Sequence, residues 1–195
     1  MVAQPKKSSL TAEEYLAVER KARFKSEFYK GEMFAMAGAD KAHNLIVSNV
    51  LRVLGNQLLE RDCNLYPSDM RVKVRQLDKY TYPDISVTCG EEIFEDDQVD
   101  TLLNPVLIIE VLSDSTEAYD RGMKFEHYQH IGALSEYLLI AQNSCRVEQY
   151  MRQHNKKWTY QEFHSLDDVV ALKAIGCVLA LKEIYFKTAK GGSFK

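Results

Sequence analysis

The chain has 195 residues, of which 46% are hydrophobic, and this is enough for a substantial core. Its formal charge of −3 argues against a generic basic coat for nucleic acid, although a local positive groove is compatible with that total. No apolar run approaches membrane-spanning length and residues 1–10 lack the apolar segment of a secretion signal, so we expect no membrane partner.

The sequence contains no repeat and no low-complexity tract, so we expect a single domain over residues 1–195, with a core from about 10 to 187 and frayed termini. The cysteines lack CxxC spacing and the histidines form no zinc pattern. We therefore expect reduced thiols, which agrees with a cytoplasmic protein. The four cysteines are Cys63, Cys89, Cys145 and Cys177.

The N-terminal part predicts a short helix followed by a β-hairpin. Thr11 and Glu14 have the spacing of a capping box, which predicts a helix after Thr11. Residues 23–36 alternate around a Lys-Gly pair, which predicts a hairpin whose turn uses Gly31. Glu32 begins the second strand of this hairpin, where an ordinary surface glutamate and a site residue are equally good interpretations.

A long helix is predicted from about residue 41 to 61, because apolar residues recur there at helical spacing. Asp40 stands in the N-cap position of this helix. His43 falls in its first turn, where a histidine is usually solvated or capping, and contact with a substrate is the alternative.

The next predicted strand carries alternating basic residues. Arg71, Lys73 and Arg75 alternate with valines, so one face of the strand should be cationic and the other apolar. A solvated edge face is the common explanation of such a stripe. If this strand flanks a site, the three cations could instead hold the phosphates of a nucleic acid.

Two predicted strands carry acidic residues whose position calls for an explanation. In residues 82–88, Asp84 shares one face with polar side chains, while the other face is apolar. In residues 105–112, Glu110 interrupts an apolar run that predicts a central strand buried on both faces. An ionised carboxylate inside a sheet is costly unless it is paired, hydrogen-bonded or bound to a metal. Either Glu110 forms a structural ion pair while Asp84 lies in a turn, or the two carboxylates converge at a site.

A helix is predicted after the second of these strands. The Ser-Asp-Ser-Thr cluster at residues 113–116 can cap it. Arg121, Lys124 and Tyr128 lie on one side of this helix at i, i+3 and i+7, so they could face the acidic residues.

The remainder of the chain predicts further strands and no second site. His127 and His130 are interpreted as surface histidines, because no second cluster completes a metal site. Residues 136–141 predict a buried strand, residues 146–163 a hairpin, and residues 166–181 a closing strand or a strand followed by a helix.

The combination of Pro83-Asp84 with Glu110-Val111-Leu112 resembles the PD-(D/E)xK nuclease superfamily, although Leu112 stands where the usual lysine is expected. A larger set of motifs is similar to the Uma family of restriction-endonuclease-like proteins, over about residues 10 to 187. In that family the lysine is on the helix after the glutamate strand, which is Lys124 here. The matching motifs lie at residues 29–33, 36–39, 43–44, 82–85, 110–113 and 124–128.

The resemblance implies a restriction-endonuclease-like α/β fold, with a mixed central β-sheet flanked by helices. It implies a metal-dependent endonuclease that hydrolyses DNA phosphodiester bonds, with Asp84, Glu110 and Lys124 as catalytic residues and Glu32 as a third acidic candidate. Asp84, Glu110 and the carbonyl of Val111 are the implied metal ligands. Hard oxygen ligands suit Mg²⁺, with Mn²⁺ as an alternative, and a lysine could orient or help deprotonate water.

DNA is the implied partner, and a homodimer is compatible with the resemblance. We expect Arg71, Lys73, Arg75 and His43 to contact it. Two alternatives remain open. One is a catalytically impaired nucleic-acid-binding protein of the same fold, which Leu112 at the lysine position favours. The other is an unrelated α/β protein in which the acidic strand residue makes a structural ion pair.

Overall fold

The computed structural model describes residues 9–188, so the predicted fraying of the outermost residues lies outside the described part. The helices are α1 (Ala12–Glu19), α2 (Lys41–Leu58), α3 (Glu117–Tyr119), α4 (Phe125–Tyr128) and α5 (Leu181–Ile184), with a 3₁₀ turn η1 (Arg75–Leu77) and a π-helical turn η2 (Asp120–Lys124). The strands are β1 (Ser26–Tyr29), β2 (Glu32–Ala35), β3 (Cys63–Pro67), β4 (Arg71–Val74), β5 (Lys79–Thr81), β6 (Ile85–Cys89), β7 (Thr101–Leu102), β8 (Leu107–Leu112), β9 (Glu136–Ala141), β10 (Val147–Arg152), β11 (Trp158–Phe163), β12 (Val169–Leu172) and β13 (Cys177–Ala180).

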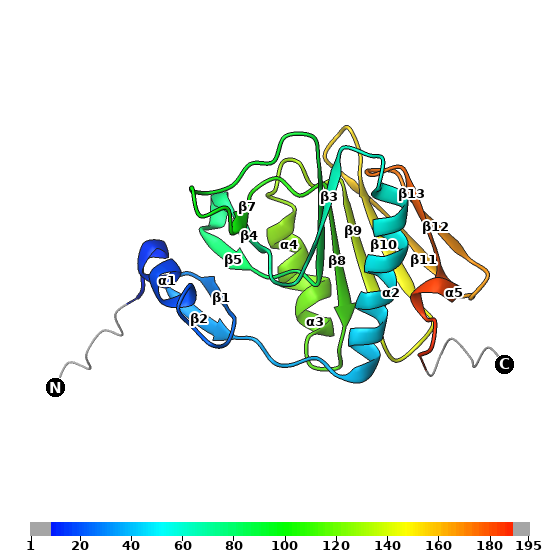
Figure 1. Cartoon of the computed structure of the whole chain (residues 1–195), viewed down its shortest axis with the longest axis horizontal. Coiled ribbons are helices and arrows are strands. Elements are labelled where there is room, and N and C mark those ends of the chain that lie inside the picture. Colours follow the sequence, from blue (N-terminus) through cyan, green and yellow to red (C-terminus); the bar gives the residue numbers. More distant parts are fainter. Residues whose placement is uncertain (1–8, 189–195) are drawn as a thin grey trace.

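These strands form two main sheets (Figure 1). A six-stranded sheet has the order β11-β10-β9-β8-β6-β3, and a five-stranded sheet has the order β2-β1-β5-β4-β7. In the larger sheet β8 and β9 are parallel, while the other neighbours are antiparallel. The predicted α/β fold with a mixed central sheet is therefore confirmed.

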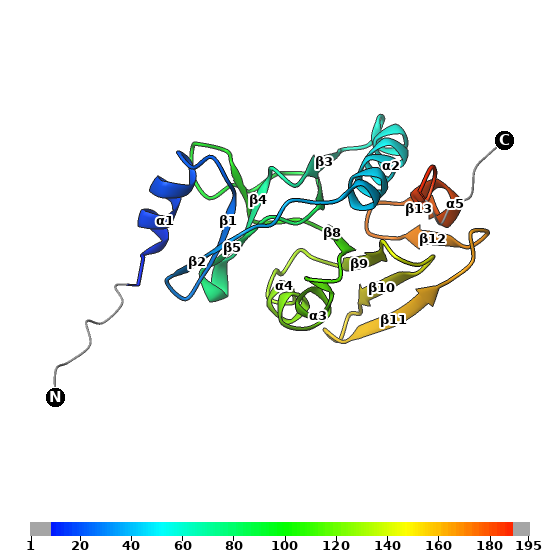
Figure 2. The same ribbon diagram turned by 90° about the horizontal axis from the view of Figure 1, so that it is seen from below.

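Helices cover both faces of the six-stranded sheet. Figure 2 shows α2, α5 and the β12-β13 pair on one side and α3 and α4 on the other. The apolar stripe of α2, including Ile46, Val50 and Leu54, packs with Ile109 and Val111 of β8 in one core. This is the arrangement that the helical spacing of the apolar residues predicted. Asp40 caps α2 by accepting a hydrogen bond of 2.9 Å from the His43 N–H.

The N-terminal helix and hairpin form as the sequence predicts. Thr11 and Glu14 make both bonds of the capping box of α1. Antiparallel β1 and β2 pair through the predicted turn, in which Gly31 has φ +79°, a value that disfavours residues with a Cβ atom. The hairpin joins the five-stranded sheet through β5, so the start of the chain belongs to a different sheet from β8.

The expectation of four reduced cysteines is wrong. Cys63 and Cys89 form a disulfide, because antiparallel β3 and β6 place the two residues directly opposite each other. Cys145 and Cys177 are free thiols. The spacing of the cysteines in the sequence does not reveal this pair, since it depends on strand register. Of the helices within residues 9–188, none combines the length and apolar character needed to cross a membrane.

Candidate active site

Glu110 lies in the middle of β8 and faces the helical segment that follows the strand. Successive strand residues point to opposite faces, and Ile109 and Val111 pack beneath α2. Ile108 and Leu112 pack on the other side of the sheet. Glu110 projects to that second side, where it is 3% exposed. It is thus the buried strand carboxylate that the sequence indicated.

Lys124 reaches Glu110 from the helical segment. Its Nζ atom lies 2.8 Å from Glu110 Oε1 and 3.2 Å from Asp120 Oδ1. Tyr128 donates a second hydrogen bond of 2.9 Å to Glu110 Oε1. Both Lys124 and Tyr128 are buried, so the contact between the strand acid and the helix lysine is largely shielded from solvent.

The segment that carries Lys124 is not the regular helix that the sequence predicted. It consists of α3, the π-helical turn η2 and α4, and no side-chain bond caps α3 at Thr116. Such π-helical turns inside helices are frequent at functional sites. Tyr137 fixes the turn by donating to the Asp120 carbonyl at 3.0 Å. Arg121, which was expected to face the acidic residues, instead makes an ion pair with Glu148 of β10.

Asp84 stands immediately before β6 and is linked to Glu110 through the main chain. Its N–H donates to Glu110 Oε2 at 3.3 Å, while its own Oδ2 accepts from the Val111 N–H at 2.7 Å. His43 of α2 contacts the same oxygen through Nε2 at 3.1 Å. Asp84 and His43 are 18% and 14% exposed at their side chains, so this end of the cluster is open to solvent. The structure therefore brings Asp84, Glu110, Lys124 and His43 together.

Burial and like charge raise the pKa of Glu110 to about 8. Burial is the largest cause; Lys124 acts in the opposite direction, and the carboxylates of Asp120 and Asp84 raise the pKa further. Lys124 remains charged, because Glu110, Asp120 and Glu27 outweigh its burial and raise its pKa well above the usual value. Burial alone would lower the pKa of His43, but Asp84 and Asp40 raise it.

Glu27 of β1 is a site residue that the sequence analysis missed. One of its oxygens lies 3.8 Å from Lys124 Nζ, and the other accepts from the Tyr119 hydroxyl at 2.9 Å. Burial would raise the pKa of Glu27, but the charges of Lys124 and Lys79 lower it. Glu110 drew attention because it is an acidic residue within a predicted strand. Glu27 is also an acidic residue within a predicted strand, so the same pattern could have identified it.

Glu32, the acidic candidate from the same hairpin, lies at the start of β2 and is exposed. Its pairing partner across the hairpin is Tyr29. The hairpin therefore supplies the buried cluster with Glu27, and the role proposed for Glu32 stays a prediction.

Lys79 and His127 extend the cluster toward β5. The Lys79 ammonium lies 2.5 Å from the Tyr119 hydroxyl and 3.1 Å from His127 Nδ1. Burial lowers the pKa of Lys79 to about 8, although Glu27 acts against that change. The interpretation of His127 as a surface residue is wrong, since it is 6% exposed and its ring packs 4.7 Å from the ring of Tyr29.

Of the three cations predicted to line one strand face, Arg71 and Lys73 lie in β4 and Arg75 does not. Arg71 is 3% exposed and forms an ion pair of 2.8 Å with Asp100. Lys73 pairs with Glu95 at 2.6 Å. Arg75 is exposed and lies in η1, outside β4. The predicted alternation holds within β4, since Val72 and Val74 pack in an apolar core. The expectation of three free cations on one face is wrong, because acidic partners from the loop before β7 pair with Arg71 and Lys73 and Arg75 lies outside the strand.

The chemistry of the cluster fits a divalent cation. Asp84 and Glu110 bring two carboxyl groups together, and each accepts a hydrogen bond from a main-chain N–H at or next to the other residue. Carboxylate oxygens are the donors that Mg²⁺ takes, and Mg²⁺ keeps several waters. Within residues 9–188 no three His, Cys, Asp or Glu side chains are spaced to hold a metal ion. Asp84 and Glu110 would therefore be the two side-chain ligands, and water or the main chain would supply the rest.

Comparisons with known proteins agree with the motifs in the sequence. The family model Uma2, described as "Putative restriction endonuclease", matches residues 12–182. The uncharacterized protein slr1290 of Synechocystis sp. is 37% identical over 176 residues, which cover 90% of this chain and 91% of that protein. The uncharacterized protein sll1609 of the same organism is 40% identical over 153 residues, covering 78% and 86%.

The fold also has a counterpart among solved structures. The crystal structure of a putative nuclease belonging to DUF820 from Anabaena variabilis superposes with a TM-score of 0.75 at 21% identity. The superposition covers 90% of this chain and 97% of the other. The likeness at this identity concerns the fold, whereas the family match spans most of the sequence. The protein therefore belongs to the Uma2 family.

Proposed function

We propose that this protein is a metal-dependent endonuclease that hydrolyses phosphodiester bonds of DNA. The observation that carries the proposal is the contact of 2.8 Å between Lys124 and Glu110, with Asp84 bonded to the main chain of the same strand. An acid pair with a buried lysine is suited to phosphodiester hydrolysis. The family match and the fold of the DUF820 protein support the same class of activity.

Each residue of the cluster has a distinct part in this proposal. Asp84 and Glu110 would hold the metal ion, and the carbonyl of Val111 would be a further ligand. A bound Mg²⁺ or Mn²⁺ would polarise the phosphoryl oxygens and lower the pKa of water. Lys124 carries a positive charge next to Glu110 in the buried part of the cluster, where such a charge stabilises negative charge more strongly than it would in bulk solvent. His43 lies at the open end beside Asp84, where an imidazolium can contact a phosphate.

A catalytically impaired DNA-binding protein is the second candidate, and Leu112 is the observation that favours it. This residue stands at the position of the usual lysine and packs in the apolar core. The position of Lys124 argues against an impaired protein. Its ammonium group reaches the face of β8 to which a lysine at position 112 would point. The proposal of an active enzyme therefore rests on a lysine that comes from the helix.

Cleavage of plasmid and linear DNA by the purified chain, with Mg²⁺, with Mn²⁺ and with a chelator, tests the proposal. We expect cleavage with either metal and none with chelator. Asp84→Asn and Lys124→Ala should each reduce the rate by about a hundredfold or more, because each removes a charge that acts on the transition state. Lys124→Ala should retain a rise in Tm on addition of Mg²⁺, since Asp84 and Glu110 remain.

Two exposed residues far from the cluster provide matched controls. Asp167→Asn and Lys182→Ala change the same residue types on the surface, and both should cleave at the wild-type rate. If the wild-type chain binds DNA without cleaving it, the DNA-binding protein becomes the supported function in place of the endonuclease. Full activity in Asp84→Asn would overturn the assignment of the site.

A further inference from the structure

We propose that a pocket beside the active site binds one nucleobase of the substrate, with Phe24 stacking on the base and Glu19 accepting a hydrogen bond from its amino group. The inference rests on the proposed function, since it assumes a nucleic acid bound at Asp84 and Glu110. It adds a preference among bases, which a cluster that acts on phosphate does not supply.

The pocket lies between the end of α1, the loop before β1 and the segment that leads into β6. Its volume is about 180 Å³, which at about 30 Å³ per molecule of liquid water is space for about six waters. Tyr82 forms one wall of the pocket and stands two residues before Asp84 in the chain. A strand that occupies the pocket therefore passes close to the catalytic carboxylate.

Glu19 lines this pocket, and one oxygen of its carboxylate has no hydrogen-bond partner within the described residues. The residue is 6% exposed, and its Oε1 atom accepts from the Tyr82 hydroxyl and the Ser26 N–H, both at 2.9 Å. Its Oε2 atom is buried and has no hydrogen-bond partner among residues 9–188. A buried oxygen without a donor is costly. A rotation of the carboxylate that turns this oxygen toward an N–H group of a ligand in the pocket would therefore gain a bond that the protein leaves open. Asp69 offers a second acceptor at the rim.

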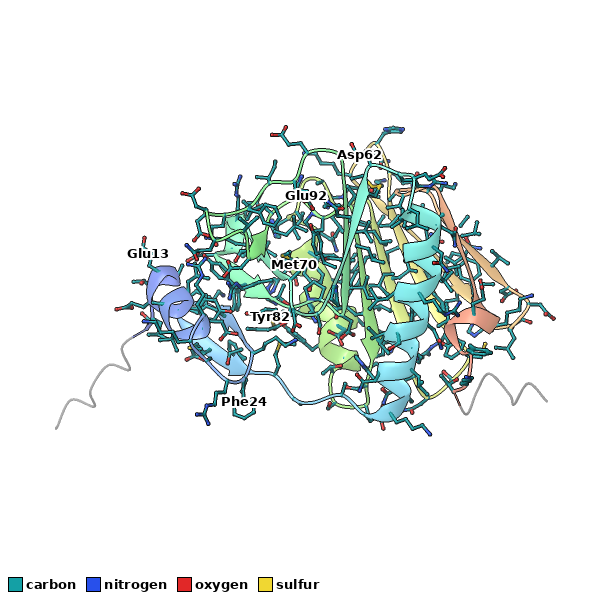
Figure 3. All side chains as sticks on the ribbon, viewed as in Figure 1. Glu13, Phe24, Asp62, Met70, Tyr82 and Glu92 are labelled. Carbon is teal, nitrogen blue, oxygen red and sulfur yellow. A yellow bond between two sulfur atoms is a disulfide. The ribbon has the colours of Figure 1, made fainter. Side chains whose placement is uncertain are left out.

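Phe24 supplies an aromatic surface at the mouth of the pocket. Its side chain is 81% exposed, and Figure 3 shows it at the lower edge of the molecule, with Tyr82 above it. Every base has a π-face, so stacking on an aromatic ring captures bases with little regard to their identity. Phe24 thus accounts for affinity, and Glu19 accounts for selection.

The cations around the pocket favour a nucleotide within a strand as the occupant. Residues 20–25 contain four cations and no acid. Arg20 is occupied by Asp96 and Asp100, and Lys25 contacts Asp69. Lys21 and Arg23 form no ion pair within the described part of the chain, so both can meet the phosphates that flank a bound base.

Fluorescence anisotropy with labelled single strands of about twelve nucleotides, in chelator so that cleavage does not interfere, tests the proposal. The labelled probes for this experiment are an all-cytosine, an all-thymine and an abasic strand. Cytosine carries an amino group where thymine carries a carbonyl, so the wild-type chain should bind the cytosine strand more tightly. Phe24→Ala should weaken that binding by about fivefold to a hundredfold and leave binding of the abasic strand unchanged.

Three further variants separate the pocket from general effects. Glu19→Gln, with folding verified by its thermal melt, should reduce or reverse the preference for cytosine, because an amide can donate to the thymine carbonyl. Phe24→Trp should retain wild-type affinity. Leu59→Ala removes a side chain of similar exposure, 80%, and should change nothing.

Two results would refute the proposal that this pocket binds a nucleobase. One is an equal loss on the cytosine and abasic strands in Phe24→Ala, and the other is a cytosine preference that survives in Glu19→Gln. If the wild-type chain nevertheless cleaves DNA with Mg²⁺, the proposed function stands and only the proposal of a base-binding pocket is refuted. If the chain neither binds strands nor cleaves them, both proposals fail.

Discussion

Replacing Glu110 with glutamine should stabilise the metal-free protein at pH 8. The pKa of Glu110 is raised from its ordinary value of 4.5 to about 8, first by burial. Between these two values the folded protein keeps a proton that the unfolded chain releases, so stability falls as pH rises through that window. Glutamine has the shape of the protonated acid and does not titrate, so Glu110→Gln should lack this loss.

The size of the effect follows from the width of the window. Each pH unit changes the free energy of unfolding by about 1.4 kcal/mol for one proton, so the interval from 4.5 to about 8 corresponds to about 5 kcal/mol as an upper limit. Other groups near the cluster titrate in both proteins. His43, whose pKa is raised, and His127, whose pKa is lowered, are present in both proteins, so most of their contribution cancels when wild type and variant are compared. Lys79, whose pKa burial lowers to about 8 while Glu110 acts against that change, titrates only at the top of the pH range.

Urea unfolding in chelator at intervals from pH 5 to about pH 8.5 measures this difference. The two proteins should be closest in stability near pH 5, and the variant should be more stable by a margin that grows toward pH 8. Added Mg²⁺ should then raise the stability of the wild type at pH 8 and leave Glu110→Gln unchanged. A constant difference across the pH range, or a variant that is less stable at pH 8, would refute the reasoning.

Two predictions concern parts of the protein that hold the site in place. Glu27→Gln removes the carboxylate that faces both Lys124 and Lys79, so it should lower the free energy of unfolding by about 3 to 5 kcal/mol in urea titrations. Glu60→Gln, an exposed change after the end of α2, should stay within about 0.5 kcal/mol, and equal losses in the two variants would contradict the assignment. Cys63→Ser opens a loop of 26 residues, which should cost about 3.5 kcal/mol on chain entropy alone. Unfolding of wild type with and without reductant checks that value, and no difference between them would argue against the disulfide.

The elements that sequence patterns predicted well are those with a long or strong local signal. The helix from Lys41 carries its apolar stripe for five turns, and β8 is an apolar run with one acid. Glu110 was predictable because a charge inside such a run breaks a local pattern. Lys124 was indicated by the family resemblance and by the absence of a lysine at Leu112, rather than by a signal of its own.

What the sequence did not predict depends on contacts between distant segments. The burial of Arg71 follows from its partner Asp100, which arrives with another strand. The disulfide follows from the register of β3 and β6. Glu27 meets Lys124, and Lys79 meets Tyr119 and His127, because the helical segment packs against strands of the five-stranded sheet. None of these contacts can be recognised from the periodicity of the sequence around the residues that make it.

Lys124 has acidic neighbours from both main sheets, Glu110 on β8 and Glu27 on β1, and this arrangement restricts the motions open to the molecule. A hinge that moved the five-stranded sheet away from the six-stranded sheet would leave a buried ammonium group and a buried carboxylate without each other, which costs several kcal/mol. Rigid-body opening of that kind should therefore be rare. Amide hydrogens of β1 and β8 should exchange with solvent in the same cooperative event.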